Sequence, residues 1–348
     1  MKKLLLVGSS SVHLINFEKL ISGYFDKVLW LTDKKVPGTG IDTIELGFSF
    51  LKPINLLQTP SKIRRIIKEF QPSVIHIHQA NSYAYYTLKA ASRCSCPVVL
   101  TAWGSDILQL PGRNMLMRKM VAANLRGANI LTADSGSLAA EMQRLVPDKK
   151  LQISVANFGI DIPPFNYRSK ENIIYSNRLH KKLYRIDRII RGFKRLVGSA
   201  KNTEWKLVIA GAGEETENLQ LLATDPGLNG RVQFEGWVDN ATNTDLYARA
   251  KFFVSLPESD GTSVSLLEAM ANGCVPILSD IPANKEWVTN GENGIIVGEQ
   301  EEDLFSRALL LDHVKVAAAN RELISSRASK DASRKKFFSI YDELLNLQ

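Results

Sequence analysis

The chain has 348 residues, of which 45% are hydrophobic and 23% are charged, and its formal net charge is +8. This length exceeds what one ordinary domain needs, so we expect two domains. No apolar run approaches the roughly 18 residues that a membrane span requires, which excludes a membrane-spanning protein, and the composition is typical of globular proteins.

Positive charge is concentrated in the first half of the chain. Residues 1–165 hold 20 Lys and Arg against 11 Asp and Glu, whereas residues 166–348 hold 24 against 25. This asymmetry indicates an anionic partner for the first half, either a nucleic acid, a membrane surface or a phosphorylated substrate. A solvated basic surface that aids solubility is an equal alternative. The three cysteines, Cys94, Cys96 and Cys274, lack metal-ligand spacing and predict a reducing, cytoplasmic compartment.

Short apolar runs alternate with longer helical patterns along the whole chain. The runs of the first half are residues 3–8, 27–32, 73–78, 97–102 and 129–134. Strands that are apolar on both faces predict parallel sheets covered by helices, with ligands at the carboxyl ends of the strands. A Pro-containing linker at 159–171 predicts a first domain at 1–164, a second at 165–330, and a last helix at 331–348.

The first domain contains two places where histidine follows or lies within a strand. The loop GSSSVH, residues 8–13, presents backbone amides and His13 at the end of the first strand. The segment HIH, residues 76–78, places two imidazoles on one face of a strand, but two ligands without a third do not make a metal site. The helix 113–126 mixes Met and Leu with Arg and Lys; it suits either an anionic membrane surface or ordinary amphipathic packing.

The first motifs of the second domain are a basic run and a glycine-containing loop. The run SNRLHKKLYRIDRIIRGF covers residues 176–193, and its later arginines suit a solvated helix face. The loop IAGAGEET, residues 209–216, has a Gly-x-Gly turn after a strand, and Glu235 ends the next strand. Because Thr216 replaces the third glycine of a dinucleotide fingerprint, we interpret the loop as a tight strand-to-helix connection.

The segment around residues 253–280 combines a strand, a polar loop and a helix. In it KFFVSLP is the predicted strand, ESDGT the loop and SVSLLEAMAN the helix, with Ser263 as its expected cap. Free amides at the helix start, next to Gly261, suit a phosphate or diphosphate, and Glu268 suits the hydroxyls of a ribose. Alternatively, Asp260 and Ser263 only cap the helix and Glu268 is solvated.

Residues 253–297, FVSLPESDGTSVSLLEAMANGCVPILSDIPANKEWVTNGENGIIV, resemble the donor-binding region of the family 4, group 1 glycosyltransferases. The family signature is a Glu, seven residues and a second Glu. VANFGID at 155–161, the run at 176–193 and the helix at 335–348 agree with the same resemblance. The resemblance implies a retaining reaction and the GT-B fold. This fold has two doubly wound Rossmann-like domains that face each other across a cleft, with the last helix returning to the first domain.

The resemblance implies roles for individual residues of the second domain. Glu268 binds the nucleotide ribose, and amides of the following loop residues hold sugar and diphosphate: Gly261, Thr262, Ser263 and Val264. Asp260 stands at the position of the first Glu beside the transferred sugar, and because it is one methylene shorter, Glu258 is an alternative. Arg178 and Lys182 neutralise the diphosphate, with Lys181 as the alternative lysine.

Four further positions complete the site that the resemblance implies. The backbone at Trp237, in GWV at 236–238, reads the nucleobase, and Gly211 belongs to the donor-binding positions. His13 acts from the first domain. Many family members carry His where this chain has Trp103, so Asp106 is expected to supply the acceptor contact to the sugar.

The resulting prediction is a metal-independent hexosyltransferase that uses a UDP- or GDP-sugar as donor and no cofactor, since no Asp-x-Asp metal motif occurs. The expected acceptor is a glycan or a lipid-diphosphate-linked glycan of bacterial surface polysaccharide, and peripheral contact with an anionic membrane is expected through the basic first domain. A nucleotide-sugar 2-epimerase of the same fold is the alternative. A dinucleotide oxidoreductase lacks the third glycine, and a nucleic-acid-binding protein lacks interleaved aromatic and basic residues.

Overall fold

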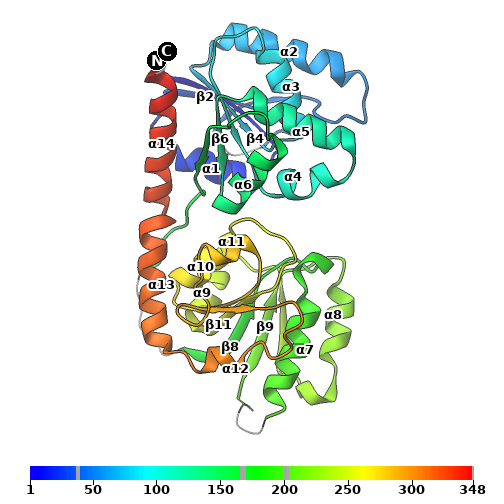
Figure 1. Ribbon diagram of the computed structural model, residues 1–348, viewed down its shortest axis with the longest axis vertical. Helices are drawn as coiled ribbons and strands as arrows, with labels where there is room; N and C mark the ends of the chain where they lie inside the picture. The colour runs from blue at the N-terminus through cyan, green and yellow to red at the C-terminus, as the bar shows by residue number, and fades with distance from the viewer. Residues whose placement is uncertain (37–39, 165–169, 200–201, 203, 347–348) are drawn as a thin grey trace. The chain divides into compact units, whose positions relative to one another are not determined.

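The computed structural model describes residues 1–36, 40–164, 170–199, 202 and 204–346. The chain divides into two compact units (Figure 1): unit 1 is Met1–Phe158 with Ser333–Gln348, and unit 2 is Gly159–Ala332. Each unit contains one sheet of parallel strands, so the predicted α/β fold class is confirmed. The predicted linker and domain boundary near 164 involve residues 165–169, which lie outside the described residues, as do residues 347–348 of the predicted last helix.

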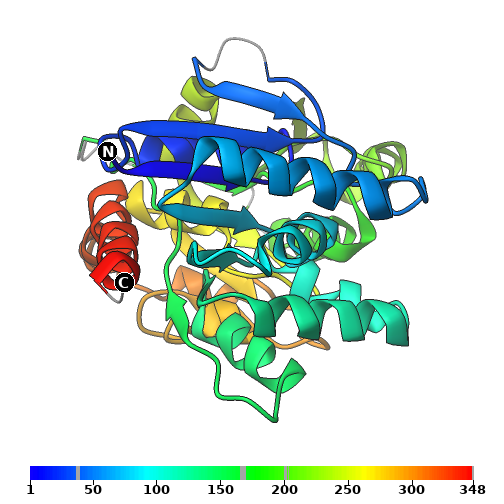
Figure 2. The same cartoon turned by 90° about the horizontal axis from the view of Figure 1, so that it is seen from above.

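The sheet of unit 1 has the order β3-β2-β1-β4-β5-β6-β7, and its neighbouring strands are all parallel. Its strands are β1 Lys3–Val7, β2 Lys27–Thr32, β3 Asp42–Glu45, β4 Val74–His78, β5 Val98–Thr101, β6 Ile130–Ala133 and β7 Ile153–Val155. In Figure 2 the strand arrows of this unit point the same way. The chain reverses its direction of winding between β1 and β4, which makes the loops after these two strands a switch point.

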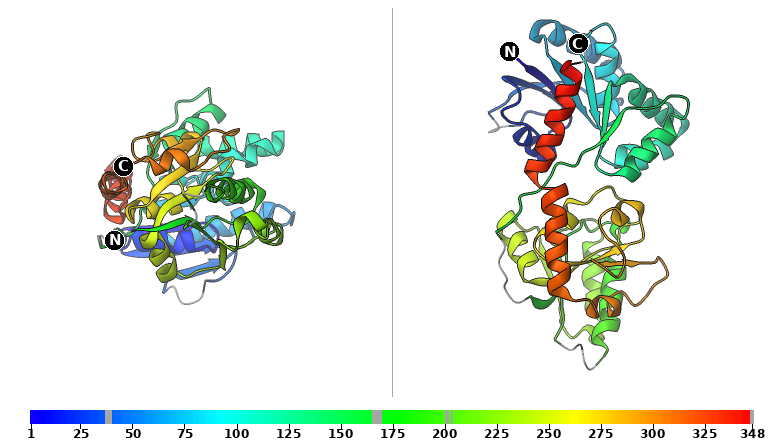
Figure 3. Two further views of the ribbon diagram at one scale, coloured as in Figure 1. Left: turned by 90° about the horizontal axis from the view of Figure 1, so that it is seen from below. Right: turned by 60° about the vertical axis from the view of Figure 1, so that its left-hand side comes forward.

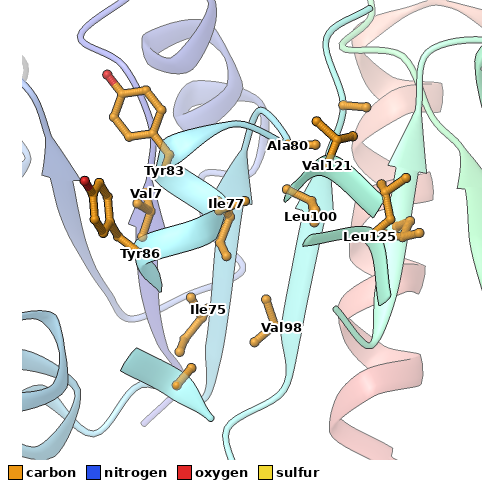
Figure 4. Packing of buried hydrophobic residues seen from close by; sticks show 14 of the residues in the cluster. Val7, Ile75, Ile77, Ala80, Tyr83, Tyr86, Val98, Leu100, Val121 and Leu125 are labelled. Atoms are coloured by element: carbon orange, nitrogen blue, oxygen red, sulfur yellow. The ribbon is translucent and has the colours of Figure 1, made fainter. Parts of the chain in front are cut away.

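Helices cover both faces of this sheet. They are α1 Val12–Leu20, α2 Asn55–Phe70, α3 Ser82–Ala91, α4 Ser105–Leu108, η1 Leu110–Gly112, α5 Met115–Gly127, α6 Gly136–Leu145 and, from the end of the chain, α14 Lys330–Asn346. Alternate residues of β4 face opposite sides. Ile75 and Ile77 belong to one cluster with residues of α2, α3, α5 and α6, whereas Val74 packs with α1 and α14. Figure 4 shows the two isoleucines with labelled residues of α3 and α5, such as Tyr86 and Val121.

Helix α14, the red end of the chain in Figure 3, is held to the sheet of unit 1 by a chain of buried hydrogen bonds. The hydroxyl of Tyr341 lies 2.8 Å from His76 Nδ1, and His76 Nε2 lies 2.7 Å from the hydroxyl of Thr101. The rings of His76 and His78 are stacked 4.6 Å apart, and both histidines are fully buried. Burial lowers the pKa of His76 to about 3, so the HIH segment is a neutral part of the core.

The sheet of unit 2 has the order β10-β9-β8-β11-β12-β13, again with parallel neighbours. Its strands are β8 Glu171–Ser176, β9 Lys206–Ala210, β10 Val232–Gly236, β11 Ala250–Ser255, β12 Val275–Ser279 and β13 Ile295–Val297. Its helices are η2 Lys182–Tyr184, α7 Ile186–Val197, α8 Thr216–Ala223, η4 Pro226–Leu228, α9 Asn240–Arg249, α10 Val264–Ala271, α11 Pro282–Lys285, α12 Ser306–Leu309 and α13 His313–Arg327. The strand order is that of a Rossmann fold, with β8 and β11 at its switch point.

Candidate active site

The polar residues of unit 2 converge where β8 and β11 end side by side. Arg178 follows β8 by two residues, and Asp260 lies in the loop after β11. Because ligands of open parallel sheets bind beyond the carboxyl ends of the strands at such a switch point, this is where a site is expected. The loop after β11 is fixed by Ser279, whose hydroxyl donates to the carbonyl of Pro257 at 2.7 Å.

The guanidinium of Arg178 is held on three sides. Its Nη2 donates to Asp260 Oδ2 at 2.5 Å, its Nη1 donates to the hydroxyl of Ser263, and its plane lies over the ring of Tyr184, 4.4 Å from the centroid. The side chain is only 10% exposed. Several contacts therefore fix a buried cation at the carboxyl edge of the sheet, which suits electrostatic stabilisation of an anion.

Ser263 occupies the N-cap position of α10, but the prediction that its side chain caps the helix is wrong. No side-chain cap hydrogen bond forms there, and the hydroxyl accepts the hydrogen bond from Arg178 instead. The first amides of a helix have no acceptor within it, and in the preceding loop the Gly261 amide donates to Asp260 Oδ1 at 3.0 Å. Thr262 is fixed by Trp287, whose Nε1 donates to its hydroxyl at 3.2 Å, and Val264 is the first residue of α10.

Glu268 lies half-buried on α10, within a cluster of uncharged polar side chains. Asn243 Nδ2 is 3.5 Å from Glu268 Oε2 and Asn243 Oδ1 accepts from the hydroxyl of Tyr175 at 2.7 Å; Asn177 Nδ2 donates to the hydroxyl of Tyr247, also at 2.7 Å. Burial raises the pKa of Glu268, and hydrogen bonds from Tyr247 and Asn243 oppose that rise. These hydrogen bonds therefore orient the carboxylate but offset only part of the cost of burying its charge. Hydroxyl groups of a ligand would supply further hydrogen bonds to it.

Four members of this cluster were missed by the sequence interpretation: Tyr175, Asn177, Asn243 and Tyr247. One usable signal was present, because Asn243 and Tyr247 are four residues apart and lie on one face of α9. Asn177, which directly precedes Arg178, was also within the basic motif that had been examined.

The turn after β9 lies directly beneath the Arg178 loop. A Cβ on Gly211 would lie 2.7 Å from the carbonyl oxygen of Arg178, and a Cβ on Gly213 would lie 2.4 Å from that of His180. Gly211 also has φ +104°, a conformation that glycine tolerates best. The two glycines thus allow the backbone of residues 178–180 to lie close against the turn at 211–213. Residues 178–180 fill the space that the phosphates of a dinucleotide would need.

The two candidate lysines, Lys181 and Lys182, are both exposed, and Lys182 begins η2. Both line a pocket of about 770 Å³ that also includes Arg185 and Glu258. Arg185 Nη1 is 3.2 Å from Glu258 Oε1, and Glu258 is more exposed than Asp260. The geometry of unit 2 therefore does not choose between the two lysines, whereas it brings Asp260 and not Glu258 to Arg178.

Trp237 is 73% exposed and directly follows β10. The preceding Gly236 has φ +63°, and its carbonyl accepts from the Gly211 amide at 2.6 Å. The main chain before Trp237 is thus joined to the turn under the Arg178 loop. The Trp237 indole lies outside the core. This places the predicted base-reading position at the same carboxyl edge of the sheet.

The predicted residues of unit 1 lie around its own switch point. His13 is exposed on the first turn of α1, edge-on to Trp103 with ring centroids 5.5 Å apart. Trp103 Nε1 donates to His78 Nδ1 at 3.1 Å. Asp106 is 4% exposed and accepts from the amides of Ala80 at 2.6 Å and Trp103 at 2.9 Å. These bonds give Asp106 a structural role in joining the loops after β4 and β5.

Two negative findings concern metals and membranes. Within the described residues, no group of three or more His, Cys, Asp or Glu side chains is placed to hold a metal ion. Among the helices of those same residues, none combines the length and the apolar character needed to cross a bilayer.

Each half of the chain matches a family of known proteins. Residues 162–311 match the family described as glycosyl transferases group 1, and residues 3–135 match the family described as glycosyl transferase 4-like. N-acetyl-alpha-D-glucosaminyl L-malate synthase of Bacillus anthracis is 26% identical over 69% of this chain and 65% of that protein. GDP-mannose:cellobiosyl-diphosphopolyprenol alpha-mannosyltransferase of Xanthomonas campestris is 28% identical over 38% of this chain. The chain spans 65% and 32% of the lengths of these two relatives.

A solved structure shows the same fold over the full length. Anabaena Alr3699/HepE, crystallised in complex with UDP and glucose, superposes with a TM-score of 0.80 at 15% identity, covering 99% of this chain and all of the other. The two parallel-sheet units together therefore have the GT-B fold.

Proposed function

Because this chain belongs to the group 1, family 4 glycosyltransferases of GT-B fold, we propose that it moves a hexose-type sugar from a nucleotide-diphosphate sugar to an acceptor, with retention at the anomeric carbon. The donor is a UDP- or GDP-sugar, and the acceptor is a glycan or lipid-linked glycan of bacterial surface polysaccharide. The Anabaena structure contains UDP and glucose, and the name of the Xanthomonas relative specifies GDP-mannose and a diphosphopolyprenol-linked acceptor. Both support these substrate classes.

The observation that carries this proposal is the position of Arg178. Its guanidinium is buried beside the N-terminus of α10, at the switch point of the unit 2 sheet. A fixed cation next to free helix amides binds a diphosphate well, and it gains most when the leaving diphosphate acquires negative charge. Glu268, on the same helix, is oriented to accept hydrogen bonds from the two ribose hydroxyls.

In the proposed reaction the acceptor hydroxyl oxygen forms a bond to the anomeric carbon of the donor sugar. The bond between that carbon and the diphosphate oxygen breaks, and the proton of the acceptor hydroxyl passes to a diphosphate oxygen. Arg178 and Lys182, or Lys181 in its place, stabilise the diphosphate during this step. Charged side chains thus supply the stabilisation that a metal ion would give.

The remaining residues have supporting roles in this proposal. Amides from Gly261 to Val264 hold the sugar and diphosphate, the backbone at Trp237 contacts the base, and Gly211 lets the Arg178 loop lie close to the sheet. Asp260 orients Arg178 beside the sugar. From unit 1, His13 and Asp106 act on the acceptor side, His13 directly and Asp106 by holding its loop.

The same proposal places the enzyme at the cytoplasmic face of a membrane. All three cysteines are free in the structure, which supports a reducing compartment. The excess of 20 cationic over 11 acidic residues in 1–165 supports an anionic surface or acceptor as the partner of unit 1. Nucleic acid is not part of this proposal.

A binding and product assay tests the function. We expect UDP- or GDP-sugars to raise the melting temperature of the wild type, and Glu268→Ala and Arg178→Ala to abolish that rise. With a lipid-diphosphate-linked acceptor, the products should be the free nucleoside diphosphate and a glycoside with retained configuration at the anomeric carbon. No stabilisation by any nucleotide sugar, or equal stabilisation of Glu268→Ala, contradicts the donor site. Formation of an epimeric nucleotide sugar without acceptor selects the 2-epimerase instead.

A further inference from the structure

We propose that unit 1 inserts into bilayers that contain anionic lipids through an aliphatic and basic surface at the N-terminal ends of α2 and α5. The aliphatic residues of this tip surface are Leu51, Ile54, Leu57, Met115 and Leu116. The proposal deepens the membrane contact described above and rests on it. It specifies insertion of named side chains, where the charge asymmetry alone indicates only attraction to a negative surface.

The five side chains are far more exposed than apolar residues of a folded core. Their exposed fractions lie between 59% and 93%, with Leu51 the highest. The helices that carry them are otherwise well packed, since Ile63, Ile66 and Ile67 of α2 are buried in the unit 1 core. Exposed apolar groups that lie together on a stable helix end indicate a surface that contacts something apolar.

The topology of unit 1 brings the two helix ends to one edge of the sheet. All strands are parallel, and α2 and α5 lead back from the carboxyl ends of strands to the amino ends of β4 and β6. Both helices pack on the same face of the sheet, with α3 in contact with each. Figures 1 and 2 show their N-terminal ends on the same side of unit 1, the side to which the strand arrows point.

The sequence segments that carry these residues contain charges of one sign. Residues 46–68 and 107–133 contain no Asp or Glu. Near the tips, the exposed cations are Lys52, Arg113, Arg118 and Lys119. Within the described residues none of these four forms an ion pair. Unpaired cations beside aliphatic groups fit a bilayer whose headgroups are negative and whose interior is apolar.

Unit 2 provides a contrast within the same chain. Its exposed aliphatic residues Leu221 and Leu310 are 72% and 86% exposed, which is comparable to the tip residues. They are accompanied by acids, however: Glu217 and Asp225 flank Leu221, and Asp312 follows Leu310. Single apolar residues among negative charges are ordinary surface features and would be repelled by an anionic bilayer.

The side chains at the tips favour lipid over other anionic partners. Nucleic acids are bound by cations together with aromatic rings that stack on bases, but the tip residues are all aliphatic or thioether. Leu, Ile and Met gain free energy when they enter the boundary between headgroups and acyl chains. Insertion at this edge would also bring the segments that follow β1 and β5, which contain the predicted residues His13 and Asp106, near the lipid headgroups.

Co-sedimentation with vesicles tests insertion. The full chain is mixed with phosphatidylcholine vesicles, with or without about 30% phosphatidylglycerol, at about 0.1 M and about 0.5 M NaCl. We expect binding to the anionic vesicles that persists in part at the higher salt, because the aliphatic contribution is not screened. Leu51→Ser with Leu57→Ser should lower the partition coefficient at least about tenfold, and Met115→Ser with Leu116→Ser should do the same.

The matched control is Leu310→Ser with Val314→Ser, which removes two aliphatic side chains of unit 2 with comparable exposed fractions, 86% and 70%, and should bind as the wild type does. Unchanged binding of both tip variants overturns the proposal. Loss of all wild-type binding at the higher salt also overturns it. So does RNA that abolishes vesicle binding of the wild type and binds the tip variants as well as it binds the wild type. Either result shows a purely electrostatic contact. Stabilisation by nucleotide sugars is measured on every variant. If nucleotide sugars stabilise the wild type but it does not bind vesicles, the insertion proposal fails and the transferase proposal stands. If nucleotide sugars do not stabilise the wild type, the transferase proposal fails.

Discussion

Arg178 Nη2 donates to Asp260 Oδ2 at 2.5 Å, and this ion pair joins the loop after β8 to the loop after β11. The pair lies between the ring of Tyr184 and the start of α10, so the acid that the sequence suggested for the sugar also positions the guanidinium. Because an Asp side chain is short, its carboxylate reaches Arg178 only when the two loops are close together. The following predictions test that arrangement.

Asp260→Asn should lower kcat/KM for the donor about tenfold or more, since it removes the charge that orients Arg178. Asp260→Glu keeps the charge, and with a longer reach it should retain more activity than the Asn variant. Steady-state kinetics with a fixed acceptor measure both. Wild-type kinetics for Asp260→Asn would show that Ser263 and Tyr184 suffice to hold the guanidinium.

Tyr184→Leu should raise the donor KM about 3- to 30-fold, because the guanidinium loses the aromatic face that it lies against. Tyr184→Phe is the matched control, since it keeps the ring and removes only the hydroxyl. Isothermal titration with the nucleoside diphosphate gives the same comparison without turnover. If Leu and Phe variants bind equally well, the ring contact has no part in holding Arg178.

Glu268→Gln should separate stability from binding. Burial raises the pKa of Glu268 in the folded protein, so the folded state holds this proton more tightly than the unfolded state does. Ionisation of Glu268 therefore lowers the free energy of unfolding. The contribution of its protonated form to stability is present at low pH and is lost as the pH rises through the folded pKa. We expect the Gln variant to melt at a higher temperature than the wild type near neutral pH, and this advantage to shrink as the pH falls.

The same Glu268→Gln variant should lose donor binding at neutral pH, because a carboxylate accepts hydrogen bonds from both ribose hydroxyls and an amide does so less well. Melting curves between about pH 4.5 and 8, with and without donor, provide both readouts. An advantage of the Gln variant that grows as the pH falls would contradict the raised pKa.

Gly213→Ala should destabilise unit 2 by about 2 kcal/mol or more, since the added Cβ would lie 2.4 Å from a backbone oxygen that cannot move freely. Gly112→Ala is the control: nothing lies within 4 Å of its Cβ position, and its φ is ordinary. Denaturant unfolding monitored by fluorescence compares the two. Equal stabilities would mean that the loop 178–180 can withdraw from the turn beneath it.

The fold was predictable because its strands are buried on both faces. Runs such as LLLV and VIHIH therefore read as continuous apolar segments, and their alternation with helical patterns implied parallel sheets. The roles of Arg178 and Glu268 came from the motif spacing of the resemblance, and the structure places them at one sheet edge. The contacts among them were not predictable from sequence, since pairing depends on which loops the topology brings together.

Two particular errors show what the sequence lacks. Ser263 looked like a helix cap because Ser commonly fills that position, but the nearby guanidinium is a competing donor that only the folded loop supplies. Tyr184 and Tyr247 were not singled out as site residues, because a tyrosine in a helical pattern gives no sign of what its ring or hydroxyl will face. The partners of Ser263 and Tyr247 lie more than 20 residues away along the chain, whereas Arg178 lies in the same segment as Tyr184.

The return of α14 to unit 1 also determines the order in which the chain can fold during synthesis. Unit 2 is one continuous segment, Gly159–Ala332, whereas unit 1 needs residues that are synthesised after unit 2. Until Tyr341 and Phe337 arrive, the Tyr341 hydroxyl is missing from His76 Nδ1, and one face of the unit 1 sheet has α1 but not α14 packed against it. The sheet of unit 1, although synthesised before unit 2, therefore acquires its complete set of covering helices only after unit 2 has been synthesised.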